Sequence, residues 1–167
     1  MLVLGPNQEI KYHPMKGCGS SRMRELFKAL YDANKDNHNI LPTEICIVRD
    51  PWKRFLCLLS YKRYNFEIDF NDYFYVPSFL QLQYLPDWHN DNITYFKYNK
   101  QVLSQICLLF REKNVIISDE LWPTDIVHVN KLNNETIKHY NSVKHELIEK
   151  HLQKDIDFYN SLSYYNV

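Results

Sequence analysis

The sequence predicts an α/β fold in which a central parallel sheet is flanked by helices, with residues 1–167 forming one compact domain. Two strand–turn–helix units follow one another between residues 9 and 61, and consecutive units of this kind build parallel sheets. The hydrophobic content of 45% and the aromatic content of 15% are sufficient for a packed core. These values exclude disordered and collagen-like classes of protein, and the length suits a single domain.

The first unit contains a conspicuous glycine run. A short strand is predicted at Glu9–His13, Pro14 ends it, and two of the three glycines in the whole chain lie within Lys16–Ser21. Glycine this scarce and this clustered indicates that the backbone there needs positive φ or a close approach to a ligand. Apolar residues then recur at helical spacing over Arg22–Asn34. A strand, a glycine-containing turn and a helix make up a phosphate-binding loop, so the predicted sheet is P-loop-like.

The second unit begins with a continuous apolar run at Glu44–Val48, which is typical of a buried parallel strand. Pro51 is well placed as the first residue of a helix that extends to Tyr61. Ligands of open parallel sheets bind beyond the carboxyl ends of the strands. We therefore expect Lys16–Ser21 and Arg49, which follow two such strands, to face one crevice.

The remainder of the chain is predicted more coarsely, from periodicity and turn residues. These predictions are a short helix at Phe79–Tyr84, a loop at Asp87–Asn92, a helix at Gln101–Arg111, strands at Val115–Ser118 and Ile126–Val129, and helical periodicity over Glu135–Asn160.

Charge and cysteine content limit the classes of partner. The 20 basic and 20 acidic residues balance, so a general polyanion-binding surface and nucleic acid are not expected, and any anion site must be local. The four cysteines lack zinc-ligand spacing, which predicts buried, reduced thiols and no metal. The chain shows no signal-peptide pattern and no apolar run approaching about 20 residues. We expect a cytoplasmic protein without a membrane span.

The glycine run has the residue types of an anion site. Ser20 and Ser21 are expected to cap the helix and present hydroxyls, while Lys16 adds a positive charge beside the helix N-terminus. Because Lys16 precedes the glycines, the spacing differs from the Walker A pattern, whose lysine follows the second glycine. Arg49 can bind a phosphate through two hydrogen bonds. The alternatives are an ordinary capped turn and an arginine paired with Asp50 or a helix end.

These segments together resemble the sulfotransferases that use 3′-phosphoadenosine 5′-phosphosulfate (PAPS), most closely the carbohydrate sulfotransferase branch. Lys16–Ser21 is similar to the 5′-phosphosulfate loop, roughly Pro-Lys-x-Gly-Gly-Thr-Ser, and Val48–Cys57 is similar to the 3′-phosphate segment, roughly Val-Arg-Asp-Pro-Tyr-x-Arg-Phe-x-Ser. Asp87–His89 is similar to an Asp-x-His element of that branch, and Leu147–Phe158 to its C-terminal helix. The resemblance covers most of the chain in order.

The resemblance implies a sulfotransferase-like fold and transfer of a sulfuryl group from PAPS to an acceptor hydroxyl, on a glycan or small molecule, without a metal. Lys16 is the implied catalytic cation, and the general base is His89 or, as second choice, His38. Cys57 stands where the family has a phosphate-binding serine, and a thiol is a weaker donor than a hydroxyl, so Ser60 is an alternative donor one turn later. The implied nucleotide-binding residues are Lys16, Gly17, Cys18, Gly19, Ser20, Ser21, Arg49, Cys57 and Ser60.

Two other functions stay open at this stage. One is a catalytically inactive relative that binds nucleotide without transfer, which Cys57 and the short length make plausible. The other is a P-loop small-molecule kinase, against which the lack of a Gly-Lys-Ser/Thr triplet argues. Animal carbohydrate relatives sit in the Golgi behind a membrane anchor, so the Golgi lumen is the alternative location if the chain is a fragment.

Overall fold

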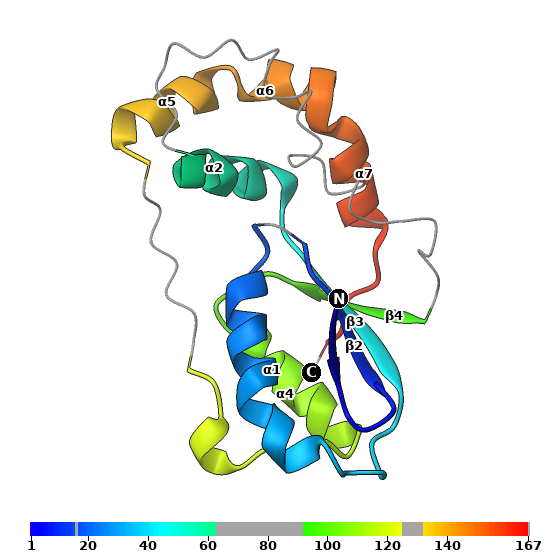
Figure 1. Cartoon of the computed structure of the whole chain (residues 1–167). Coiled ribbons are helices and arrows are strands. Elements are labelled where there is room, and N and C mark those ends of the chain that lie inside the picture. The colour runs from blue at the N-terminus through cyan, green and yellow to red at the C-terminus, as the bar shows by residue number, and fades with distance from the viewer. Residues whose placement is uncertain (16, 63–91, 125–131, 167) are drawn as a thin grey trace. The chain divides into compact units, whose positions relative to one another are not determined.

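The computed structural model describes residues 1–15, 17–62, 92–124 and 132–166 (Figure 1). The described residues form two compact units. The first unit contains residues 1–48, 92–124 and 163–166, and the second contains residues 49–62 and 132–162. The single domain expected from the sequence stays a prediction.

The first unit is built on a four-stranded sheet in the order β1-β2-β3-β4. Strands β2 (Ile10–His13), β3 (Thr43–Val48) and β4 (Ile93–Lys97) run parallel to one another, which confirms the two predicted strands and their parallel pairing. Strand β1 (Leu2–Leu4) runs antiparallel to β2 and makes the sheet mixed. The fold is therefore α/β, as predicted, with an antiparallel edge strand that the sequence analysis did not predict.

Two helices of the first unit pack on the sheet, α1 (Ser20–Asn34) and α4 (Val102–Glu112) (Figure 1). The ring of Phe27 in α1 joins the layers, because its centroid lies 6.2 Å from that of Tyr12 in β2 and 5.9 Å from that of Phe110 in α4. Both helices were predicted from their apolar spacing, and each buries that apolar side.

The strand predicted at Val115–Ser118 is wrong, because this segment has no regular secondary structure. The side chain of Asn34, fully buried at the end of α1, takes the place of a neighbouring strand. Its Oδ1 accepts the Ile116 N–H at 2.8 Å, and its Nδ2 donates to the Ile116 carbonyl at 2.9 Å. A short 3₁₀ helix, η3 (Asp119–Leu121), follows.

The second unit consists of helices. Helix α2 (Pro51–Lys62) was predicted from Pro51 onward, and Asp50 caps it by accepting the Lys53 N–H at 2.8 Å. The helical periodicity over Glu135–Asn160 is divided between α5 (Asn134–Ser142), α6 (Lys144–Leu147), the π-helix η4 (Ile148–Leu152) and α7 (Gln153–Ser161).

The π-helix has a packing role. Leu147 and Leu152 are five residues apart, which in an α-helix would separate their directions by about 140°. The wider i→i+5 turn brings them onto nearly the same side, and both are buried in the core of the second unit. The buried members of this core are Trp52, Phe55, Leu58, Leu59, Tyr140, Leu147 and Leu152.

The predicted helix at Phe79–Tyr84 and strand at Ile126–Val129 lie outside the described residues, as does the loop at Asp87–Asn92 apart from its last residue. Across the part of the chain that is described, we find no helix with both the length and the apolar character that crossing a membrane requires.

Candidate functional site

The glycine run forms a tight turn between β2 and α1. Gly17 has a φ of 79° and Gly19 a φ of 83°, so both occupy the left-handed region that the glycine clustering predicted. The Cys18 N–H donates to the Met15 carbonyl at 3.1 Å, and the Met23 N–H donates to the Gly19 carbonyl at 3.1 Å, which begins α1. The turn lies between the carboxyl end of β2 and the first turn of α1.

The first turn of α1 is capped differently from the prediction. Gly19 is the N-cap residue and offers no side-chain hydrogen bond, whereas Ser20 is already helical. The Ser20 hydroxyl donates backward to the Met15 carbonyl at 2.8 Å, and Ser21 is exposed. The expectation that these serines cap the helix is wrong, because the left-handed glycine already starts the helix and directs Ser20 towards the turn.

The N-terminus of α1 has the electrostatics of an anion site. The first N–H groups of a helix lack intrahelical acceptors, and the dipole makes that end positive. The first turn of α1 holds no acidic residue. Arg22 adds a positive charge, and its Nη1 lies 2.9 Å from Oε2 of Glu25 in an exposed pair. The described residues of the turn thus fit a phosphate or sulfate group.

Tyr98, which follows β4, packs beside this turn. Its N–H donates to the Val48 carbonyl at 2.7 Å, which holds it at the carboxyl edge of β3. A Cβ placed on Gly19 would lie 2.9 Å from Cε2 of the Tyr98 ring. Glycine is therefore favoured at position 19 for two reasons: its φ is positive, and a Cβ there would crowd the Tyr98 ring. The sequence offered no sign of this contact, because β4 was not predicted.

A histidine and a carboxylate are paired at the end of β2. Nε2 of His13 lies 2.8 Å from Oε2 of Glu44 on β3, and the Lys11 ammonium lies 3.3 Å from the other carboxylate oxygen. The hydrogen bond from His13 lowers the pKa of Glu44, with further lowering from Lys11 against the effect of burial. The sequence analysis did not name His13 as a site residue; the structure shows a half-buried imidazole oriented by a carboxylate.

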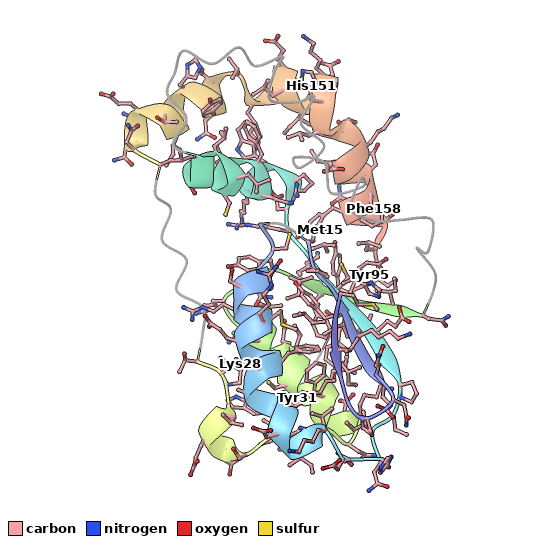
Figure 2. The ribbon with its side chains drawn as sticks, viewed as in Figure 1. Met15, Lys28, Tyr31, Tyr95, His151 and Phe158 are labelled. Carbon is pink, nitrogen blue, oxygen red and sulfur yellow. The ribbon has the colours of Figure 1, made fainter. Side chains whose placement is uncertain are left out.

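The structure describes one of the three predicted catalytic groups, His38. Lys16 and His89 lie outside the described residues. His38 is exposed in the connection from α1 to β3, close enough to Glu9 for their charges to interact. Figure 2 shows Met15 and Tyr31 at opposite ends of α1, and His38 follows the Tyr31 end. The 15 residues of this helix span about 20 Å, so His38 is not brought to the glycine turn.

Apart from Val48, the predicted 3′-phosphate segment belongs to the second unit. Arg49 is buried with 7% exposure, and Asp50 uses Oδ1 to cap α2. Cys57 is buried, and the Ser60 hydroxyl donates to the Cys57 carbonyl at 2.6 Å. The hydrogen of the Ser60 hydroxyl is thus already used within α2.

The four cysteines are buried free thiols, as predicted. Burial raises the pKa of Cys107 to about 12, so this thiol stays protonated at neutral pH. Within the described ranges no three His, Cys, Asp or Glu side chains gather as a metal site.

No family model, curated protein or solved structure matches this chain.

Proposed function

We propose that this protein is a sulfotransferase that moves a sulfuryl group from PAPS to an acceptor hydroxyl, on a carbohydrate, by in-line displacement. The observation that carries the proposal is the turn at Gly17–Ser20, with two left-handed glycines, a hydroxyl and a helix N-terminus that lacks acidic residues. Lys16–Ser21 and Val48–Cys57 resemble the two nucleotide-binding segments of that family. This resemblance favours the phosphosulfate of PAPS as the anion that the turn binds.

The roles of the chain's residues follow from the charge that develops during transfer. Backbone amides of the turn and the hydroxyls of Ser20 and Ser21 bind the 5′-phosphate. Lys16 neutralises the charge that develops on the bridging oxygen as the sulfur–oxygen bond breaks. Arg49 binds the 3′-phosphate. The leaving group is 3′-phosphoadenosine 5′-phosphate, and positioning with charge stabilisation supplies most of the rate.

The acceptor hydroxyl must lose its proton to a base as its oxygen bonds to sulfur. The resemblance favours His89 for this role. The geometry adds His13, which ends β2 three residues before Lys16 and is held by Glu44 at 2.8 Å. A carboxylate that orients an imidazole and stabilises its protonated form is a recurring arrangement for a general base. The distance along α1 leaves His38 without a place in this proposal.

The first experiment measures transfer from labelled PAPS to a panel of glycans and small hydroxyl compounds. Lys16→Ala should lower the rate at least about 100-fold, as loss of a charge-stabilising group does in other enzymes. Lys28→Ala, which removes an exposed lysine from α1, is the matched control and should leave the rate unchanged. Full activity of the Lys16 variant would end the proposed mechanism.

A second experiment tests the nucleotide roles by calorimetry. Arg49→Ala should weaken binding of 3′-phosphoadenosine 5′-phosphate more than binding of adenosine 5′-phosphate, because Arg49 is assigned to the 3′-phosphate. An equal loss for both nucleotides would remove that assignment. Binding without any transfer in the wild-type chain would instead identify an inactive relative.

The base is identified by comparing three variants, His13→Ala, His89→Ala and His38→Ala, in rate and in pH profile. The variant of the true base should lose the rate and the acidic limb of the profile together. Glu44→Gln should lower the rate only if His13 is the base.

A further inference from the structure

Tyr12 carries a buried hydroxyl beneath the glycine turn. The residue lies within β2 with 0% exposure, and its hydroxyl oxygen has no hydrogen-bond partner among the residues that the structure describes. Most buried polar groups in proteins are paired, because an unpaired one loses its bonds to water. Phenylalanine would pack against Phe27 equally well without that cost. The hydroxyl therefore needs an explanation.

The groups around this hydroxyl belong to the turn. Burial raises the pKa of Tyr12, and the neighbouring Ser20 hydroxyl and Met15 backbone act against that rise, so both lie close to the Tyr12 oxygen. Figure 2 labels Met15 beside the first turn of α1. The Ser20 hydroxyl donates its hydrogen to the Met15 carbonyl at 2.8 Å. A serine oxygen also has two lone pairs, so Ser20 retains the capacity to accept from Tyr12.

We propose that Tyr12 is a positioning residue for an anion bound at the glycine turn, acting through Ser20. When a phosphate or sulfate ester occupies the turn, the Ser20 hydroxyl rotates away from the Met15 carbonyl and donates to the anion. The Tyr12 hydroxyl then donates to Ser20 Oγ and holds it in that orientation. Hydrogen bonds in such a chain polarise one another, so the contact from Ser20 to the anion is strengthened. This inference rests on the proposed function for the presence of an anion at the turn.

The burial of the two residues determines their separate tasks. Ser20 is half-buried and is reached from solvent, whereas Tyr12 is sealed beneath it. Tyr12 therefore influences the ligand through Ser20 and makes no direct contact with it. This order of contacts predicts that removing Ser20 also removes the effect of Tyr12.

The test is a double-mutant cycle on the full chain, with calorimetric titration of inorganic sulfate, pyrophosphate and 3′-phosphoadenosine 5′-phosphate. Tyr12→Phe should weaken binding of the occupying anion about 3- to 10-fold, the range expected for one hydrogen bond. In the Ser20→Ala background the same change should have no further effect. Tyr95→Phe, at another buried tyrosine of the same sheet, is the matched control and should bind like the wild type.

Thermal unfolding separates this role from a structural one. Tyr12→Phe should unfold at the same or a higher temperature than the wild type without ligand, because no hydrogen bond to a described residue is lost. Wild-type affinity in the Tyr12 variant would overturn the inference. An equal loss with and without Ser20, or a wild-type chain that binds none of the three anions, would overturn it as well.

The outcomes for the inference and for the proposed function are distinct. Coupled effects of Tyr12 and Ser20 on sulfate or pyrophosphate, without binding of the nucleotide, would support the inference and end the sulfotransferase proposal. Sulfuryl transfer by a chain in which Tyr12→Phe leaves affinity unchanged would support the proposed function and end the inference.

Discussion

Replacing Gly19 by alanine tests the backbone of the glycine turn. A non-glycine residue in the left-handed region destabilises the folded state by about 1–2 kcal/mol. Alanine also lowers the conformational entropy of the unfolded chain, which offsets about 0.4–1 kcal/mol of that loss. The new Cβ would lie 2.9 Å from Cε2 of Tyr98, so the ring must leave its preferred rotamer at a further cost of about 0.5–1.5 kcal/mol. We expect Gly19→Ala to lower the free energy of unfolding by about 1.5 kcal/mol.

Urea unfolding followed by far-UV circular dichroism measures this change, and the melting temperature should fall by about 3–6 °C. Two further variants separate the causes. In a Tyr98→Ala background, the cost of Gly19→Ala should shrink to the backbone part. Gly19→Asn should recover some of that part, because asparagine adopts positive φ more readily. A Gly19→Ala chain as stable as the wild type would refute the reasoning, and so would equal costs in both backgrounds.

Two further predictions concern stability away from the turn. Asn34→Ala removes both hydrogen bonds that the side chain makes with Ile116 and should cost about 2–3 kcal/mol in urea unfolding, with faster hydrogen exchange at the Ile116 amide. Asn39→Ala, at an exposed position, should change stability by less than about 0.5 kcal/mol, and equal costs would remove the role of Asn34. Burial, together with the charge of Lys150, lowers the pKa of His151, so the unfolded chain gains a proton first as pH falls below the ordinary value of 6.5. Native stability should therefore fall below that pH. His151→Gln should reduce the fall in melting temperature between pH 7.5 and 5.5, and the control His145→Gln should reduce it less. An unchanged dependence of melting temperature on pH in the His151 variant would contradict this prediction.

The sequence by itself determined the features that depend on neighbouring residues. Positive φ at Gly17 and Gly19 followed from the conformational freedom of glycine, and α2 followed from Pro51, whose ring sets φ for a first helical residue. A continuous apolar run located β3, and apolar residues at helical spacing located α1. The residue types of the proposed anion-binding turn were therefore visible in the sequence.

The tertiary structure alone decided which distant groups meet. A strand needs a neighbour, and the segment at Ile116 has the buried amide of Asn34 in that place, 82 residues away along the chain. His13 and Glu44 become a pair because β2 and β3 are adjacent, and the alternation of side chains puts both on one face. The rings of Tyr12 and Phe27 lie with their centroids 6.2 Å apart because α1 packs over β2. Such contacts depend on packing between elements, and local sequence patterns carry no record of it.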